Sequence, residues 1–190
     1  MSQPARRSFG ETAILTPANL ITVGRLVATP YFIWLMVNWG ASWTTFIVGS
    51  IVGFSDGLDG LVARRQGSTR SGAFLDPLID KVVVLSCMAT LASLHEMSWI
   101  PIGIIAAREL WMSWYRTVAA KQGISIPARK NAKLKTVLQD FAIAVVILPP
   151  THSLNWLHVT VIWAATAMTL YTGLEYYLDG RRMQARSARA

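Results

Sequence analysis

The chain has 190 residues, of which 53% are hydrophobic and only 15% are charged. With a mean hydropathy of +0.38, this composition excludes an ordinary soluble domain and indicates a polytopic membrane protein. The formal charge of +8 suits attraction to anionic lipid headgroups. Nucleic-acid binding would need that charge on a soluble surface, so we expect no nucleic-acid partner. The single cysteine, Cys87, excludes a disulfide framework within the chain.

Six apolar segments follow one another along the chain, each near the ~20 residues that a bilayer requires. They predict membrane spans at roughly 18–38, 42–64, 73–94, 98–119, 134–150 and 155–178. A polar segment, 1–16, precedes them as a cytoplasmic or interfacial stretch, and a basic tail, 179–190, follows. We therefore predict one all-α domain over residues 1–190, with six transmembrane helices around a cytoplasm-facing polar cavity.

The first span opens with three polar residues on roughly one helical face, since Asn19, Thr22 and Arg25 are spaced i, i+3, i+6. One interpretation is a helix cap followed by a snorkelling arginine. The other is a ligand-binding face.

The stretch from Asp56 to Asp80 places four carboxylates among apolar residues at the facing ends of two predicted spans. Asp56 and Asp59 share one helical face, and Asp76 and Asp80 share another. A helical hairpin would bring the four together, where they would repel unless a cation lies among them. Oxygen-only ligands suit Mg²⁺ or Mn²⁺, and four carboxylates could hold two ions.

Small and basic residues accompany these acids. Gly60 and Ala63 remove side-chain bulk from the face that carries Asp56 and Asp59, so a ligand could approach the backbone closely. Arg64 and Arg70 lie in the predicted loop, where they could meet phosphate. Together these residues predict phosphoryl chemistry. The alternative, a solvated helix end, is disfavoured because apolar residues surround each acid.

The pattern D-x2-D-G-x2-A-R, a loop and G-x3-D-x3-D resembles the signature of the CDP-alcohol phosphatidyltransferases, and every specified residue is present. The loop, Arg65 to Ser71, is one residue shorter than is common in that family. The resemblance implies that Asp56, Asp59 and Asp76 hold the metals. It also implies that Asp80 acts as general base and contacts the second metal. The implied contacts to CDP-diacylglycerol are Asn19, Thr22, Arg25, Gly60, Ala63, Arg64 and Thr69.

The fourth span carries Arg108, Glu109 and Arg116, and charges at membrane depth are usually functional or paired. Because Arg108 and Glu109 are sequence neighbours, we expect them not to face each other and to need other partners. A structural ion pair of one of them with Asp140 is the alternative to a functional role.

The pattern Ala107-Arg108-Glu109, followed by Lys133-x-Lys135-Thr136-x2-Gln139, is similar to the phosphatidylglycerophosphate synthases within this family. That similarity implies transfer of a phosphatidyl group from CDP-diacylglycerol to glycerol 3-phosphate, with release of CMP. It also implies a homodimer. The residues expected to bind the acceptor phosphate are Arg108, Lys133 and Lys135, with Arg70 and Arg116 as second choices.

Lysine and arginine fall on one side of the six-span arrangement, whereas the connections near 39–41, 95–97 and 151–154 contain neither. The positive-inside rule therefore predicts cytoplasmic termini and an acidic hairpin at the cytoplasmic face of the plasma membrane. Four tryptophans would form a belt at the opposite interface: Trp39, Trp43, Trp99 and Trp156. His95, His152 and His158 fall near that interface, so no histidine ligand to the metals is expected.

Two alternatives remain. Within the family, the acceptor could be phosphatidylglycerol, which would make cardiolipin, or another alcohol. In a different class, a cation transporter also carries acids within its spans. A transporter would distribute its acids through the membrane depth and would not need the glycine and arginine that accompany them here.

Overall fold

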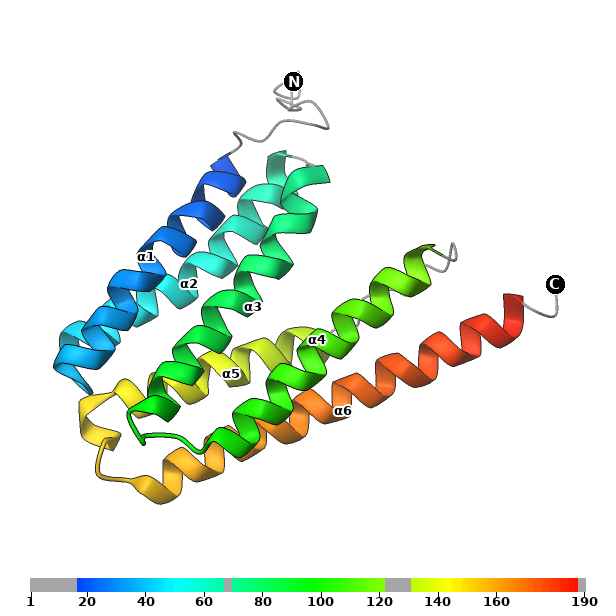
Figure 1. The fold of residues 1–190 in the computed structure, drawn as a ribbon. Coiled ribbons are helices and arrows are strands. Elements are labelled where there is room, and N and C mark those ends of the chain that lie inside the picture. The colour runs from blue at the N-terminus through cyan, green and yellow to red at the C-terminus, as the bar shows by residue number, and fades with distance from the viewer. Residues whose placement is uncertain (1–16, 67–69, 122–130, 188–190) are drawn as a thin grey trace, which may run out of the picture. The chain divides into compact units, whose positions relative to one another are not determined.

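The computed structural model describes the backbone of residues 17–66, 70–121 and 131–187, and the side chains of residues 20–55, 77–119 and 134–181. All regular structure in these residues is helical, which confirms the predicted all-α class. Six α-helices occur in the described part, and each overlaps one predicted span (Figure 1). They are α1 (Pro17–Trp39), α2 (Trp43–Gln66), α3 (Arg70–Ser93), α4 (Trp99–Lys121), α5 (Asn131–Ile147) and α6 (Asn155–Ser187), with a short 3-10 helix, η1 (Pro149–Thr151), between α5 and α6.

Local sequence signals explain where the first helices begin and end. Pro17 starts α1, where its missing N–H costs nothing and its fixed φ already suits a helix. Gly40 ends α1 with a positive φ of 54°, and its N–H donates to the Met36 carbonyl at 3.1 Å. The Ser42 hydroxyl then accepts the Thr45 N–H at 3.2 Å and caps α2.

The last helix extends beyond its predicted span. That span was expected to end near residue 178, but α6 continues to Ser187 through much of the basic tail. Arginine, methionine, glutamine and alanine in this segment all favour a helix, so its loss of hydrophobicity does not end the helix.

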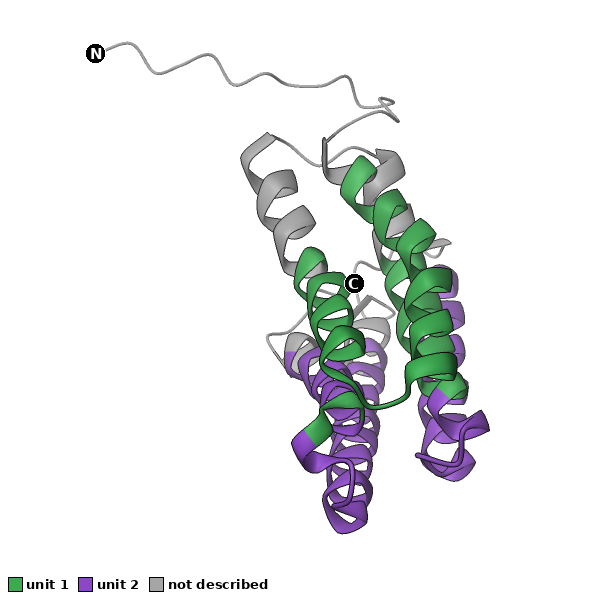
Figure 2. Ribbon diagram, turned by 90° about the vertical axis from the view of Figure 1, so that its left-hand side faces the viewer, with its two compact units in different colours: residues 1–90, 147–149 green, residues 91–146, 150–190 purple. Residues whose placement is uncertain are grey.

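The described residues fall into two compact units (Figure 2). The first is Met1–Thr90 with Ile147–Pro149, and the second is Leu91–Val146 with Pro150–Ala190. In the first unit α1 packs along α2. Gly49 permits this approach, because a Cβ there would lie 2.6 Å from Phe32 Cζ and 2.9 Å from Ile147 Cδ1.

In the second unit α4 packs along α6. The apolar core of this unit includes Ile105, Met112, Ile162 and Ala165, all of which are buried. Polar residues are buried there as well, which sets this unit apart chemically from an ordinary apolar helix pair. They are Glu109, Gln139, His158, Thr166, Thr169 and Thr172.

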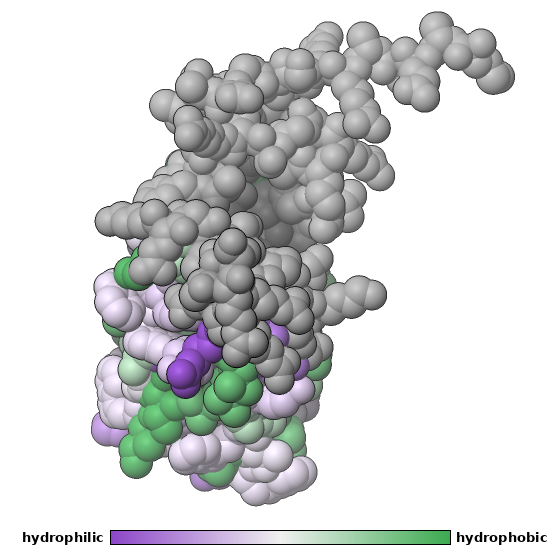
Figure 3. Space-filling view, turned by 90° about the vertical axis from the view of Figure 1, so that its right-hand side faces the viewer, coloured by the Kyte–Doolittle hydropathy of each residue, from purple (hydrophilic) through white to green (hydrophobic). Residues whose placement is uncertain are grey.

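Large apolar side chains are exposed along the helices of both units, and Figure 3 shows hydrophobic residues on one face. Two helical segments of the described chain, Leu20–Trp39 and Asn155–Arg181, are long and apolar enough to cross a membrane. The prediction of six helices is therefore confirmed for the described residues. The prediction that all six cross the membrane around a polar cavity stays a prediction. In α4, Arg108, Glu109 and Arg116 lower the mean hydropathy of a helix that was predicted to span.

Candidate active site

A first group of candidate residues, the four aspartates, lies on the parts of α2 and α3 that belong to the first unit. Because α2 ends at Gln66 and α3 begins at Arg70, only three residues connect them. At the helical rise of 1.5 Å per residue, Asp59 and Asp56 lie about 10 and 15 Å from the end of α2. Asp76 and Asp80 lie about 9 and 15 Å from the start of α3 by the same rise. The two acidic pairs therefore occupy equivalent positions along their helices.

The residue types at these backbone positions fit the divalent metals expected of this pattern, since aspartates are hard oxygen ligands. Asp80 is half-buried. Among the side chains that the structure describes, no group of three histidine, cysteine, aspartate or glutamate residues forms a metal cluster. Several predicted site residues have side chains outside the described set: Asn19, Asp56, Asp59, Gly60, Ala63, Arg64, Thr69, Arg70, Asp76 and Lys133.

On α1, Thr22 and Arg25 are both buried, with 1% and 4% of their surfaces exposed. A snorkelling arginine would leave its charged end exposed, so that interpretation of Arg25 is wrong. The backbone carbonyl of Arg25 accepts the Thr29 hydroxyl at 2.8 Å, which adds a bond within α1. Thr22 and Arg25 are thus two buried polar residues of α1.

A separate cluster of charged residues lies in the second unit. Arg108 Nη1 on α4 donates to Glu109 Oε1 at 2.9 Å. Lys135 Nζ on α5 donates to the same oxygen at 2.5 Å. The structure therefore brings together two of the residues predicted to bind the acceptor phosphate, Arg108 and Lys135, around one carboxylate.

This contact corrects the expectation that Arg108 and Glu109 would not face each other. The rule for neighbouring helix positions concerns Cβ directions, whereas the long arginine side chain returns along the helix to reach the carboxylate. The structural alternative for these residues was an ion pair with Asp140. The carboxylate that Arg108 contacts is instead that of Glu109.

Helix α6 supplies the other side of the Arg108 environment. Arg108 Nη2 donates to the Thr172 hydroxyl at 3.1 Å. A Cβ at position 173 would lie 2.8 Å from Arg108 Nε, so Gly173 is what allows this side chain to lie against α6. The Nε atom itself is buried without a hydrogen-bond partner among the described residues.

A further buried polar contact lies one turn earlier along α6. Gln139 Nε2 on α5 donates to the Thr169 hydroxyl at 3.0 Å. Thr169 and Thr172 are three residues apart, so they share a face of α6. That face therefore receives polar side chains from both α4 and α5.

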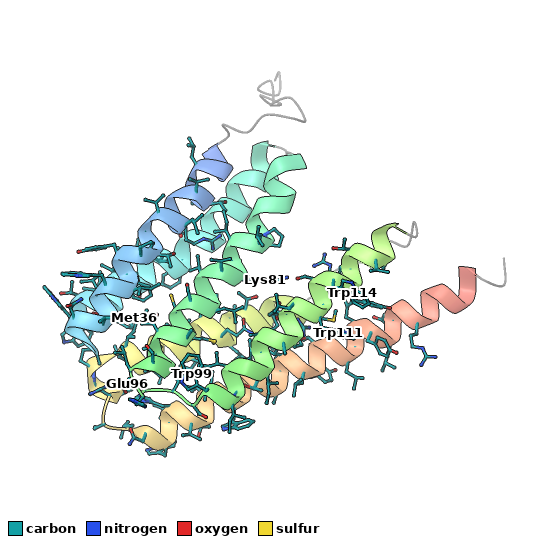
Figure 4. The ribbon with its side chains drawn as sticks, viewed as in Figure 1. Met36, Lys81, Glu96, Trp99, Trp111 and Trp114 are labelled. Atoms are coloured by element: carbon teal, nitrogen blue, oxygen red, sulfur yellow. The ribbon has the colours of Figure 1, made fainter. Side chains whose placement is uncertain are left out.

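Arg116, a second choice for the acceptor phosphate, lies elsewhere on α4. It is exposed, and its guanidinium carbon lies 5.7 Å from the centre of the Tyr176 ring. Two turns of helix, about 12 Å along the axis, separate it from Arg108. In Figure 4, Trp111 and Trp114 mark the half of α4 that also carries Arg116, whereas Trp99 marks the start of this helix. The structure does not join Arg116 to the Glu109 cluster.

Sequence reasoning missed three residues of this cluster. Glu109 was noted as a charge within a span and as part of the pattern Ala107-Arg108-Glu109, but no site role was assigned to it, although its adjacency to Arg108 was an available signal. Thr172 and Gly173 lie on α6, and only the contacts between helices reveal them.

The described helices expose apolar side chains, and the second unit buries a cluster of charged residues. The family model for CDP-alcohol phosphatidyltransferase matches residues 15–171, so the chain belongs to that family. It is thus a phosphatidyltransferase of phospholipid biosynthesis and belongs to a membrane-bound family. Membership also implies a requirement for a divalent metal.

Curated relatives cover most of the chain. A protein of Mycobacterium tuberculosis (strain H37Rv) named "Probable phosphatidylglycerophosphate synthase" is 34% identical over 176 residues, covering 88% of this chain and 82% of that protein. Proteins of Escherichia coli (strain K12) and Shigella flexneri serotype 5b are 32% identical over 172 residues, covering 86% of this chain and 93% of each. Both are named "CDP-diacylglycerol--glycerol-3-phosphate 3-phosphatidyltransferase".

Proposed function

We propose that this enzyme transfers a phosphatidyl group from CDP-diacylglycerol to glycerol 3-phosphate, giving phosphatidylglycerophosphate and CMP. The names of the relatives support this reaction. The observation that carries the choice of acceptor is the meeting of Arg108 and Lys135, from two helices, at one carboxylate oxygen. Two cations against one carboxylate leave a net positive charge, which favours an acceptor that itself carries a phosphate.

The four aspartates are proposed to hold two divalent cations, Mg²⁺ or Mn²⁺, through Asp56, Asp59, Asp76 and Asp80. When bound, such cations neutralise the pyrophosphate of the substrate and the charge that develops on the leaving CMP. The CDP-diacylglycerol contacts proposed for this chain are Asn19, Thr22, Arg25, Gly60, Ala63, Arg64 and Thr69. Burial of Thr22 and Arg25 supports a ligand-binding rather than a lipid-facing role.

Asp80 is proposed as the general base. A hydroxyl is a poor nucleophile at neutral pH, so it needs a base to accept its proton. The acceptor hydroxyl oxygen forms a bond to the phosphorus that bears diacylglycerol, and the bond from that phosphorus to the CMP oxygen breaks. The hydroxyl proton passes to Asp80, and CMP leaves with the electron pair. Half-burial of Asp80 leaves it accessible for this transfer.

Arg108, Lys133 and Lys135 are proposed to bind the acceptor phosphate, with Arg70 and Arg116 in supporting roles. The enzyme is proposed to work as a homodimer in the plasma membrane, with its active site facing the cytoplasm. The concentration of lysine and arginine on one side of the helices supports this orientation.

An acceptor panel tests the reaction. Purified protein with CDP-diacylglycerol and Mg²⁺ is given glycerol 3-phosphate, phosphatidylglycerol, inositol phosphate or no acceptor, and CMP release is followed. We expect release to be fastest with glycerol 3-phosphate and to stop in EDTA. The Asp56→Asn variant, which removes a ligand charge, serves as the inactive control. Faster release with phosphatidylglycerol would instead establish cardiolipin synthesis.

A further inference from the structure

The carboxylate of Glu109 lies at the centre of the charge cluster in the second unit. Its Oε1 atom accepts both Arg108 Nη1 at 2.9 Å and Lys135 Nζ at 2.5 Å. The Glu109 side chain is only 5% exposed, and each cation is 13% exposed. One oxygen of a nearly buried carboxylate therefore determines the positions of two cationic groups, those of Arg108 and Lys135, which come from different helices.

This arrangement has an electrostatic consequence. Two cations held within hydrogen-bond distance of one atom repel each other, and the repulsion is larger in a poorly solvated site than in water. The carboxylate offsets that repulsion and the cost of burying both cations. Without its charge, we expect Arg108 and Lys135 to move apart, toward water or toward other acceptors.

Steric contact with α6 restrains the same arginine from its other side. Thr172 accepts Arg108 Nη2 at 3.1 Å, and the missing side chain of Gly173 leaves space for Arg108 Nε. Arg108 is therefore restrained by the Glu109 carboxylate, by the Thr172 hydroxyl and by close steric contact with the backbone at Gly173. A side chain that is already restrained loses less conformational entropy when it binds a ligand, so its contact contributes more to affinity.

We propose that Glu109 is a positioning residue that holds Arg108 and Lys135 in the arrangement that binds the phosphate of the acceptor, and that Gly173 is required for the same arrangement. This inference rests on the proposed function, since it concerns the acceptor of that reaction. It assigns Glu109 no contact with the acceptor. Its effect reaches the acceptor only through the two cations.

The Glu109→Gln variant tests the role of the charge, because glutamine keeps the shape and one acceptor oxygen. We expect the KM for glycerol 3-phosphate to rise by on the order of 10- to 100-fold, the usual worth of a charge-assisted hydrogen bond. The KM for CDP-diacylglycerol should remain that of the wild type. Glu109→Asp, which restores the charge, should recover much of the loss. Glu96→Gln is the matched control, since that carboxylate lies near His152 before the start of α4.

The Gly173→Ala variant tests the same arrangement without changing any charge. Its Cβ would overlap Arg108 Nε at 2.8 Å, so the flexible arginine should shift rather than the helix. Alanine also favours a helix over glycine, so we expect wild-type thermal stability with a raised KM for glycerol 3-phosphate. If Glu109→Gln does not fold, the KM of Gly173→Ala for glycerol 3-phosphate tests the same arrangement by itself.

The outcomes separate the inference from the proposed function. If the wild type uses glycerol 3-phosphate but the folded variants keep its KM, or lose kcat alone, Glu109 and Gly173 do not position the acceptor site. A lowered KM in Glu109→Gln would show that the carboxylate competes with the acceptor, which also overturns the inference. A wild type that releases no CMP with glycerol 3-phosphate overturns the proposed function, and the inference with it.

Discussion

At the scale of single residues, the role proposed for Asp80 differs from the role proposed for the other three acids. Asp80 lies one turn after Asp76 and follows Pro77 within α3. An aspartate at that position can share the metal site through its helical face, and we propose that it also accepts the proton. We therefore propose that three of the aspartates act only as metal ligands, whereas Asp80 also accepts the proton of the acceptor hydroxyl.

Replacing Asp80 with asparagine tests this division. We expect turnover to fall by roughly 10²- to 10⁴-fold, the usual worth of general-base catalysis. The affinity for CDP-diacylglycerol should stay largely intact. Both quantities are measured on the same preparation, with Asp56→Asn as a comparison that should lose affinity and turnover together. Equal loss of both in Asp80→Asn would make Asp80 chiefly a metal ligand.

The sequence predicted the placement of some candidate residues along their helices but not the contacts of others, for a physical reason. The four aspartates are spaced along single helices, so periodicity alone places each pair on one face. Arg108 and Lys135 come from different helices, and their common partner Glu109 depends on how α4 and α5 pack. Side-chain length also matters, because the reach of Arg108 allowed a contact that helix spacing argued against.

At the scale of elements, α6 is a largely apolar helix that carries buried threonines on one face. Thr166 donates to the Ile162 carbonyl, and Thr172 donates to the Met168 carbonyl, each at 2.8 or 2.9 Å. Their hydroxyl protons are therefore used within the helix, and their oxygen lone pairs remain for other helices. Arg108 uses the oxygen of Thr172 in this way.

The close packing of α1 on α2 gives a prediction about stability. Gly49→Ala would place a methyl group 2.6 Å from the Phe32 ring, between it and Ile147. Overpacking of this kind costs about 1–3 kcal/mol, so we expect a lower midpoint of thermal unfolding in detergent. Gly53→Ala is the matched control on the same helix, because a Cβ there meets nothing within 4 Å. Unchanged stability in Gly49→Ala would contradict the described packing.

The helices themselves were largely predictable because their ends have local causes. Pro17, Gly40 and Ser42 mark boundaries that hydropathy also indicated. The end of α6 was not predictable in the same way. The polar residues after residue 178 end the apolar segment without ending the helix.

At the scale of the whole molecule, the surface and the charge distribution bear on the membrane. Each of the four tryptophans expected at one interface is more than half exposed, as interfacial anchors would be. The exposed apolar side chains of both units suit lipid contact. Basic residues concentrated on one side of the predicted spans then support the proposed orientation.

Cysteine labelling tests this orientation. With Cys87 replaced by alanine, a cysteine at Ser153 should react with a membrane-impermeant reagent added to intact cells. A cysteine at Ser68 should react only after the membrane is opened. The reverse pattern would place the acidic helices at the outer face and contradict the proposed topology.

The most direct test of the central claim follows an isotope from acceptor to lipid. Purified protein in nanodiscs is given CDP-diacylglycerol, Mg²⁺ and ¹³C-labelled glycerol 3-phosphate, and products are measured by mass spectrometry. We predict labelled phosphatidylglycerophosphate and CMP in equal amounts, both absent without the metal. CMP release without label in the lipid would contradict the proposed transfer.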